Sequence, residues 1–440
     1  MDLTMDKINS LAKRRGFVFP SSEIYGGMAN TWDYGPLGVE LKNNIKQMWW
    51  KKFVQDREDI VGIDSALIMS PKVWEASGHL GAGFADELIE CKNCHHRFRK
   101  DELLEKKNEL VCSNCGNKDF TESTKFNLMF KTFIGPKGEE EKNVAYLRPE
   151  TAQGIFVNFK NILDTTRKTI PFGIAQVGKA FRNEITPGNF IFRTREFEQM
   201  EIEYFIEEKD WEKQFKTWLN HIHDWLNLLG IDGKKITDNE IKGKELAHYS
   251  KRTIDIEYAF PFGNKELYGL AYRTDFDLRN HNLSYTDPTS GESFIPHVIE
   301  PSLGVDRSVL AVLCEHYHEE EAPKSGGGTD KRVVMRFPFW LSPIKVAILP
   351  LSKKADLSKL AKQVFDDLKN DFVCEYDETQ SIGKRYRRQD EIGTPFCVTL
   401  DFDSLKDKKA TIRHRDTMKQ ERIDIKDLKK ILKAKLNEEQ

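Results

Sequence analysis

The sequence lacks any long hydrophobic run. No stretch approaches the roughly 18 consecutive apolar residues that a membrane-spanning helix needs, and the mean hydropathy is −0.58. The first residues, Met1 to Gly16, carry mixed charge and no apolar segment of the kind found in secretory signals. We therefore expect a cytoplasmic protein with no membrane partner.

An excess of charge of one sign is also missing. The chain has 68 Lys and Arg against 70 Asp and Glu, which gives a net charge of −2. Residues 344–440 hold 22 basic and 18 acidic residues, a net of +4, so the remainder holds 46 and 52, a net of −6. A basic C-terminal part permits contact with RNA. The alternative is an ordinary solvated surface, which is the more common meaning of such asymmetry.

Cysteine is scarce, and its placement is uneven. Four of the seven cysteines form Cys91-x2-Cys94 and Cys112-x2-Cys115, with seventeen residues between the pairs. This spacing is typical of a zinc ribbon or knuckle. Two disulfides or four idle thiols are the alternatives, and the missing export signal argues against disulfides. Because four thiolates complete a tetrahedron, we expect a structural zinc ion in an insertion at residues 90–120.

What the sequence does have is a clear apolar pattern in its first part. Pro36 to Phe53 has helical spacing and begins with a proline suited to a first turn. A strand is expected from Ile60 to Met69, and Ser70-Pro71 then opens a short helix. Together with the zinc pattern, this predicts a core that begins at residues 1–89, is interrupted by the insertion and resumes at residues 121–318.

The second part of the chain differs in composition. Leu303 to Tyr317 has the apolar pattern of a helix, and residues 319–343 are acidic and then glycine-rich. We expect the latter segment to be a linker or loop. Beyond it, strand and helix patterns alternate, which predicts a small α/β domain at residues 344–440.

Residues 178–201 predict a long antiparallel hairpin. Both flanks are extended in pattern, and Thr186-Pro187-Gly188-Asn189 has strong turn chemistry. Alternation places Arg182 and Glu184 on one face of the first strand and Phe197, Gln199, Glu201 and Glu203 on one face of the second. Burying so many carboxylates is costly without ligands, although a solvated sheet face is the alternative. Arginines suit phosphate oxygens, and an aromatic ring suits the flat face of a base.

A second anion-suited pattern follows at residues 299–307. The segment reads as a strand, then Gly304, then Arg307 at the start of an apolar helix. A helix N-terminus that carries a guanidinium favours anions. In isolation, a G-x-x-R pattern has little specificity.

Taken together, these patterns resemble a known family. The hairpin F-R-x-E and R-x-x-x-F, followed by G-x-x-R, is similar to motifs 2 and 3 of the class II aminoacyl-tRNA synthetases, and the helix, strand and Pro71 resemble motif 1. Finer matches resemble the homodimeric glycyl-tRNA synthetases. They are YGGMANTWDYGPLG at 25–38, WEASGH at 74–79, LRPETAQG at 147–154 and EPS at 300–302. The resemblance extends from about Ile8 to Leu436.

The resemblance implies an α+β fold. Its parts are an antiparallel class II sheet core with flanking helices, the zinc-ribbon-like insertion and a C-terminal α/β anticodon-binding domain that contains GKRYRRQD at 383–390. It also implies an activity: activation of glycine with ATP to glycyl-adenylate, with release of pyrophosphate, and transfer of glycine to the 3′ end of tRNA(Gly). Motif 1 implies a homodimer. The basic cluster within residues 384–388 is the expected place of tRNA contact.

The resemblance assigns Arg182, Glu184 and Arg307 as catalytic residues. Arg182 would hold the α-phosphate, while Arg193 and Arg307 would hold the γ-phosphate. Phe197 would lie under the adenine, with Arg307 above it. Glu266 and Glu300 would contact Mg²⁺, which prefers carboxylate oxygens. The implied ATP site comprises Arg182, Asn183, Glu184, Phe192, Arg193, Thr194, Arg195, Glu196, Phe197, Glu266, Leu267, Gly304, Val305, Asp306 and Arg307.

For glycine, the task is to bind an ammonium and a carboxylate and to exclude anything larger. Glu150, Glu201 and Glu300 are suited to surround the ammonium, and Ser302 to crowd the direction of a side chain. Either Arg99 or Arg97, beside the zinc pairs, is implicated by the resemblance. The full implied set is Arg99, Glu150, Phe197, Glu198, Gln199, Met200, Glu201, Glu300, Pro301, Ser302, Leu303 and Gly304.

Two other interpretations remain open. One is a class II synthetase for another amino acid, such as threonine or proline. The Glu150, Glu201 and Glu300 set argues against it, since no residue is placed to receive a side chain. The other is a non-catalytic synthetase-like protein that binds RNA. Such relatives lose phosphate-binding residues, whereas Arg182 and Arg307 are present here.

Overall fold

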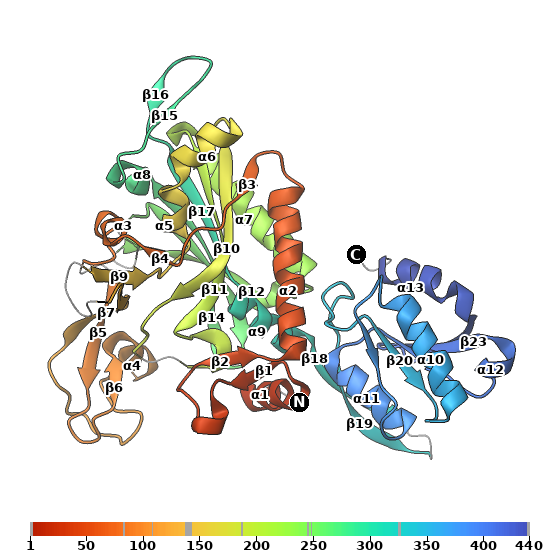
Figure 1. The fold of residues 1–440 in the computed structure, drawn as a ribbon. Coiled ribbons are helices and arrows are strands. Elements are labelled where there is room, and N and C mark those ends of the chain that lie inside the picture. Colours follow the sequence, from red (N-terminus) through yellow and green to blue (C-terminus); the bar gives the residue numbers. More distant parts are fainter. Residues whose placement is uncertain are drawn as a thin grey trace.

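The computed structural model describes residues 3–81, 84–107, 109–136, 143–185, 188–243, 246–247, 249–323 and 327–437. A large N-terminal body surrounds a seven-stranded sheet, and a smaller C-terminal domain is built on a five-stranded sheet (Figure 1). Thr186 and Pro187, in the expected turn, lie outside the described residues. None of the helices in the described ranges is both long and apolar enough to cross a membrane.

The seven strands run in the order β12-β13-β14-β17-β11-β10-β3. All neighbours pair antiparallel except β3 and β10, which pair parallel. The antiparallel core expected from the sequence is therefore confirmed. The strands are β3 (Ile60–Gly62), β10 (Phe172–Phe181), β11 (Glu196–Ile206), β12 (Ile236–Ile241), β13 (Arg252–Phe260), β14 (Gly263–Thr274) and β17 (His297–Gly304).

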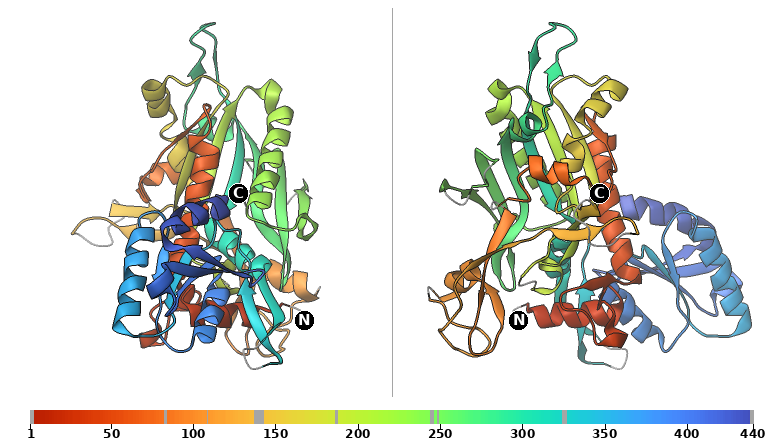
Figure 2. Two further views of the ribbon diagram at one scale, coloured as in Figure 1. Left: turned by 90° about the vertical axis from the view of Figure 1, so that its right-hand side faces the viewer. Right: turned by 60° about the vertical axis from the view of Figure 1, so that its left-hand side comes forward.

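Helices cover both faces of this sheet (Figure 2). The main hydrophobic core lies on one face, against α1, α2, α7 and α9, and a smaller core lies on the other, against α5, α6 and α8. The smaller core fills only one end of its face, which leaves the other end for polar groups. These helices are α1 (Met5–Arg15), α2 (Pro36–Trp50), α5 (Ala152–Phe156), α6 (Phe159–Thr166), α7 (Trp211–Leu228), α8 (Phe276–Asn280) and α9 (Val305–His316).

Helix α2 forms as its sequence predicts. Gly35 precedes it in an extended conformation and Pro36 takes the first turn. Leu41, Ile45 and Trp49 recur at helical spacing and are fully buried against the sheet. The helix continues into the π-helical turn η2 (Lys51–Gln55), so the expected end near residue 53 is close to the observed one.

The single strand expected from Ile60 to Met69 was wrong, because two short strands lie there. Strand β3 joins the main sheet, while β4 (Ile68–Met69) pairs with β9 (Val144–Leu147) in a separate three-stranded sheet that includes β8 (Phe130–Phe133). Arg148 holds the bend between β3 and β4. Its Nη1 donates to the backbone oxygen of Ser65 at 2.8 Å and its Nε to that of Lys179 at 2.7 Å. The short helix α3 (Pro71–Ala76) follows as expected.

The cysteine-bearing insertion is a small unit with its own core. Strands β5 (Ala85–Glu90), β6 (Arg97–Arg99) and β7 (Thr124–Asn127) form a sheet in the order β6-β5-β7, beside α4 (Lys100–Lys107). Ile89, Phe98 and Leu103 pack with the cysteines. In Figure 1 the insertion extends from the lower end of the body, opposite the projecting hairpin of β15 (Tyr285–Thr286) and β16 (Ser293–Phe294).

Residues 319–343 are not the linker that we expected. Much of this segment belongs to an antiparallel hairpin. Its strands are β18 (Tyr317–Pro323) and β19 (Thr329–Met335), with Glu319 opposite Val333. Burial explains the difference, because Ala322 on β18 and Arg332, Val334 and Met335 on β19 are fully buried, although charged residues dominate the composition of the segment. Residues 324–326, at the glycine-rich end of the loop, lie outside the described residues.

The C-terminal domain is a mixed sheet in the order β21-β20-β22-β23-β24. Strands β20, β21 and β22 are parallel and the last two antiparallel, which confirms the expected α/β organisation. Its elements are β20 (Val346–Pro350), α10 (Ala355–Leu368), β21 (Cys374–Tyr376), α11 (Ile382–Ile392), β22 (Phe396–Leu400), α12 (Ser404–Asp407), β23 (Lys409–His414), β24 (Gln420–Asp424) and α13 (Leu428–Asn437).

Candidate active site

Polar side chains gather on the end of the sheet face that the smaller core leaves free. In the register of β10, β11 and β17, Glu201 lies between Gln176 and Ser302. Because side chains alternate along a strand, Phe197 and Gln199 share the face of Glu201. The expected grouping on β11 is therefore present, and it faces away from α2.

Glu201 is 2% exposed, and four donors hold its carboxylate. Oε1 accepts from Gln199 Nε2 at 2.7 Å and from Ser302 Oγ at 2.6 Å. Oε2 accepts from the backbone nitrogen of Thr151 at 3.0 Å and also from its hydroxyl. Burial raises the pKa of Glu201, and the charge of Glu150 raises it further. The side chain is thus fixed in one orientation.

Glu150 is the second buried carboxylate of the group. Its oxygens lie 3.3 Å from His79 Nε2 and 3.2 Å from Gln153 Nε2, which donates to it. Arg273 lies within 3.9 Å. Burial alone would raise the pKa of Glu150, but His79, Arg273 and Arg182 together hold it well below its usual range. Glu150 is therefore ionised at neutral pH.

The third carboxylate, Glu300, is paired with a buried arginine. Arg273 Nη1 donates to Glu300 Oε1 at 2.7 Å, and Arg273 Nε and Nη2 donate to Asp277 at 2.8 and 3.0 Å. Burial raises the pKa of Glu300 to about 8, and Glu201 and Glu150 add to the rise although Arg273 opposes it. Three acidic groups therefore share one guanidinium, and the raised pKa values of Glu300 and Glu201 reflect a pocket with more carboxyl groups than cations to stabilise their ionised forms.

Two arginines lie beside aromatic rings at the edge of the pocket. Arg182 is 5.4 Å from the ring of Phe197 and donates from Nε to the backbone oxygen of Pro149 at 3.0 Å. Arg307 is 4.5 Å from the ring of Phe192, and its Nη1 contacts Glu266 Oε2 at 2.9 Å. In this structure Arg182, rather than Arg307, faces Phe197. An adenine between Phe197 and Arg307 remains a prediction.

The hairpin places the other predicted nucleotide residues nearby. Glu184 is 8% exposed, and its backbone oxygen accepts from Arg195 Nη2 at 3.2 Å. Thr194 donates its hydroxyl to the backbone oxygen of Glu196 at 2.7 Å. The side chain of Glu196 instead pairs with Lys179 on the outer surface, at 2.6 Å. Asn183 and Arg193 lie on the same connection, between β10 and β11.

Several predicted residues can contribute backbone atoms only. The side chains of Leu267, Met200, Leu303 and Val305 are at most 1% exposed and belong to the main hydrophobic core. Strand alternation and the start of α9 turn them away from the pocket. The assignment of these four residues to the binding sites therefore stays a prediction that concerns their backbone atoms.

Glu198 and Asp306 belong to a different cluster, on the side of α2. Lys42 Nζ lies 3.0 Å from Glu198 Oε2 and 3.1 Å from Asp306 Oδ1, and Tyr34 also donates to Asp306. Asp306 Oδ2 accepts from the backbone nitrogen of Glu198 at 2.7 Å. These contacts join α2, β11 and α9. Both carboxylates are thus engaged on the α2 side of the sheet, and the predicted parts of Glu198 and Asp306 in substrate binding stay predictions that their side-chain contacts do not support.

The four cysteines meet as the spacing predicts. Each sulfur of the first CxxC pair lies near a sulfur of the second pair. The Sγ atoms of Cys91 and Cys115 are 3.6 Å apart, and those of Cys94 and Cys112 are 3.5 Å apart. All four ligand atoms lie within 4.8 Å of one another. A tetrahedron with Zn–S bonds of about 2.3 Å has sulfur–sulfur edges of about 3.8 Å, whereas a disulfide needs about 2.05 Å. The residues therefore fit a zinc ion better than disulfides.

Sequence reasoning missed the most buried partners of the pocket. Arg273 and Asp277 are each 1% exposed, and His79 is 5% exposed. Arg273 also lies 3.9 Å from the ring of Tyr249. The sequence did contain a signal for Arg273, because it is an arginine within a largely apolar strand, β14. A buried cation requires an acidic partner, so this position indicated a buried ion pair.

Comparison with known proteins agrees with this geometry. Residues 101–317 match the family described as tRNA synthetase class II core domain (G, H, P, S and T), and residues 345–435 match the anticodon binding domain. The prolyl-tRNA synthetase of Cryptosporidium parvum, solved with L-proline and AMP, has a TM-score of 0.66 at 13% identity, covering 99% of this chain and 78% of that one. Fold and site thus define a class II aminoacyl-tRNA synthetase.

Three similar relatives carry the name glycine–tRNA ligase. That of Caldanaerobacter subterraneus subsp. tengcongensis is 55% identical, with 99% of each chain covered. That of Ruminiclostridium cellulolyticum is 55% identical, with 97% of each covered, and that of Clostridium perfringens is 53% identical, with 99% of each covered. The chain belongs to the glycine–tRNA ligase family.

Proposed function

We propose that this chain activates glycine with ATP and transfers it to tRNA(Gly). The observation that carries the proposal is the convergence of Glu150, Glu201 and Glu300 in one pocket, where Arg273 is shared between Glu150 and Glu300. A glycine ammonium supplies the positive charge that this pocket lacks. The side chains that converge there would also crowd a substrate larger than glycine, and such overpacking is penalised steeply. This argues against a threonine or proline substrate.

The chemistry requires positioning and charge neutralisation rather than a protein nucleophile. The glycine carboxylate oxygen attacks the α-phosphorus, the bond to the bridging oxygen breaks, and pyrophosphate leaves. A terminal ribose hydroxyl of tRNA then attacks the glycyl carbonyl carbon, and AMP leaves. Arg182, beside Phe197, would hold the α-phosphate, and Arg307, beside Phe192, would hold the γ-phosphate.

Two kinds of metal ion fit the residues present. Zinc would be held by the four cysteines and would stabilise the insertion without taking part in the reaction. Mg²⁺ would neutralise ATP phosphates. Glu266, whose side chain is 44% exposed beside Arg307, is suited to contact it, and Glu300 is the predicted second contact.

The insertion also offers an arginine. Arg99 Nη1 lies 3.3 Å from Asp86 Oδ2 on β5, whereas Arg97 pairs with Glu90 at the surface at 3.0 Å. Burial raises the pKa of Asp86, Arg99 opposes the rise, and the charge of Glu184, in the predicted ATP site, adds to it. Arg99 is therefore better placed than Arg97 to approach the substrates.

The remaining assignments follow from the family. The C-terminal domain would bind the anticodon arm of tRNA(Gly), through basic residues that include Lys384 and Arg387. Arg385 is an exception, because its side chain is buried and donates to the backbone oxygens of Pro350 and Asp377. We further propose a cytoplasmic homodimer that pairs through the surface around α2.

ATP–pyrophosphate exchange with each amino acid tests this proposal. Glycine should support exchange, and alanine, serine, threonine and proline should not. Arg182→Ala should abolish exchange, because removal of a phosphate-binding group from a preorganised site costs roughly 10²–10³ in rate. Exchange with another amino acid but not glycine would refute the glycine assignment. No exchange with any of them would favour an RNA-binding protein without catalysis.

A further inference from the structure

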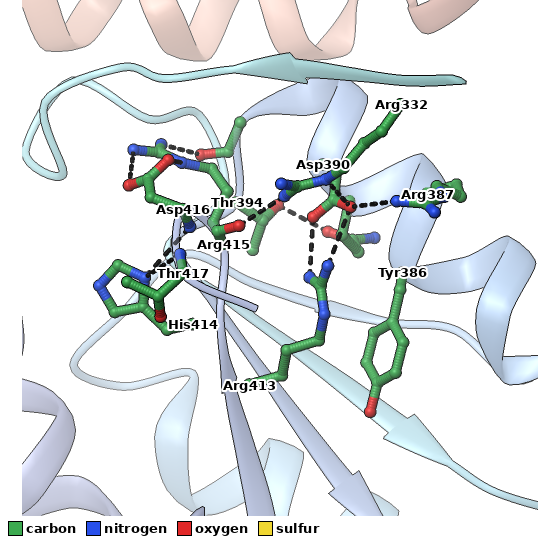
Figure 3. A network of polar contacts seen from close by, with 12 residues as sticks. Arg332, Tyr386, Arg387, Asp390, Thr394, Arg413, His414, Arg415, Asp416 and Thr417 are labelled. Carbon is green, nitrogen blue, oxygen red and sulfur yellow. Dashed lines mark hydrogen bonds and ion pairs between the residues drawn. The ribbon is translucent and has the colours of Figure 1, made fainter. Parts of the chain in front are cut away.

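A buried cluster of charges joins the hairpin β18–β19 to the C-terminal domain (Figure 3). Its centre is Asp390 on α11, which is completely buried. Arg332 Nε, from β19, donates to Asp390 Oδ2 at 2.7 Å. Arg413, from β23, donates to both oxygens, at 2.8 and 3.1 Å. Asp390 is therefore hydrogen-bonded by two guanidinium groups from different parts of the chain, and a third, that of Arg387 on the same helix, lies 3.7 Å from it.

Arg332 is fixed at every nitrogen. Besides Asp390, it donates to Glu320 on the neighbouring strand β18 and to the backbone oxygen of Arg415. Arg415 donates to the backbone oxygens of Gly393 and Phe337, each at 2.9 Å. The two arginines thus link the hairpin, the segment that follows it and the end of α11.

Apolar packing at the same place leaves little room for movement. Gly393 ends α11 with φ +81°, and a Cβ on it would lie 2.4 Å from the ring of Phe337. Ile392 is 5% exposed and belongs to the core of the N-terminal body together with Phe337. Arg14 of α1 contacts the adjacent Glu391 at 3.0 Å. The end of α11 is therefore docked on the body by both packing and charge.

A swinging motion of the C-terminal domain would separate Arg332 from Asp390. Asp390 would keep Arg413 and Arg332 would keep Glu320, but each would lose its buried partner across the junction, which is costly for buried ions. Buried ion pairs contribute more to a defined arrangement than to stability in some proteins. The network is thus suited to define one orientation of the two parts, and none of its residues lies on the strands that form the glycine and ATP pocket.

We propose that Arg332 and Asp390 are positioning residues for tRNA charging: they hold the C-terminal domain so that a tRNA bound there presents its 3′ end to the active site. The proposal rests on the proposed function, since it requires that the C-terminal domain bind the anticodon arm. Adenylate formation uses the body alone, so it should not depend on this contact.

The test compares three reactions of the full-length enzyme carrying Arg332→Gln. These are glycine-dependent ATP–pyrophosphate exchange, charging of full-length tRNA(Gly), and charging of an acceptor-stem minihelix that lacks the anticodon arm. Arg422→Gln is the matched control, because Arg422 pairs with Asp401 and Asp407 within the same domain, away from the junction. We expect kcat/KM for full-length tRNA to fall about tenfold in Arg332→Gln, a typical size for a lost coupling between sites. Exchange and minihelix charging should stay at the wild-type level.

Full-length charging that matches the Arg422→Gln control would overturn the proposal. An equal loss in all three reactions would also overturn it, because damage to the body rather than to the domain orientation would then explain the effect. If Arg332→Gln does not fold, Arg332→Lys is tested by the same criteria. A lysine keeps a charge beside Asp390 but cannot make all the contacts of the guanidinium group. A wild-type chain without glycine exchange would refute the proposed function and is readily distinguished from these results.

Discussion

Ser302 donates a hydrogen bond to Glu201 across the paired strands β17 and β11, with 2.6 Å between Ser302 Oγ and Glu201 Oε1. The donor and acceptor are directly opposite in the register. The hydroxyl therefore holds in place a carboxylate oxygen that the proposed ammonium site needs, and we predict that a substrate side chain would point toward it.

Ser302→Ala should raise KM for glycine roughly tenfold, because a hydrogen bond to a charged group contributes about 1.5–3 kcal/mol. KM for ATP should change little, since no ATP contact is removed. Glycine-dependent pyrophosphate exchange measures both constants. Ser293→Ala is the control, because Ser293 is exposed and bonds only to Thr286 among the hydrogen bonds found. A KM for glycine equal to that of the control would count against a role for Ser302.

Arg273→Lys should destabilise the fold. A lysine cannot serve Asp277 and Glu300 together in the geometry of the guanidinium, and breaking a buried ion pair costs on the order of 3 kcal/mol. Guanidinium chloride unfolding at neutral pH measures the change. Arg279→Lys alters an exposed pair with Asp275 and should leave the free energy of unfolding close to that of the wild type, because exposed ion pairs contribute little. Equal stability of the two variants would contradict this account of Arg273.

His316 should make stability fall as the pH is lowered. Burial lowers its pKa to about 4, so between about pH 6.5 and pH 4 the unfolded chain binds a proton that the folded chain does not. The contribution of this group falls by about 1 kcal/mol between pH 7.5 and pH 5.5. His316→Gln should show a correspondingly smaller loss of unfolding free energy over that range. The partly exposed His223, replaced in the same way, serves as control. An identical pH dependence of wild type and His316→Gln would show that His316 does not contribute.

Purified enzyme should contain one zinc ion per chain, and Cys112→Ser should remove most of it. Three remaining thiolates bind zinc more weakly, and the small core of the insertion contains Cys112 itself. Atomic absorption measures the metal, and limited proteolysis within residues 90–120 reports the fold of the insertion. Cys374→Ser, outside the insertion, should keep the full zinc content. A full zinc content in Cys112→Ser would exclude the four-cysteine site.

The sequence predicted those parts whose signals are local. Periodicity identified α2, and alternation placed Phe197 and Glu201 on one face, because both depend only on neighbouring residues. The role of Arg273 was missed because it depends on how β14 pairs with β17, where the register shifts between Tyr272 and Thr274. The hairpin β18–β19 was taken for a linker because its charged residues dominate the composition, whereas the burial of Arg332 depends on a partner in the C-terminal domain, Asp390.

Ile392 has a consequence for any attempt to treat the C-terminal domain as an exchangeable module. This side chain is supplied by the C-terminal domain but fills the core of the N-terminal body. A body truncated before residue 344 would lose this side chain and expose the apolar surface that it covers. A domain transplanted from another synthetase would need an apolar side chain of similar shape at the end of the corresponding helix. The boundary between the two parts is therefore defined by packing as well as by position in the sequence. Chimeras should be designed so that Ile392 and the core residues that it contacts come from the same protein.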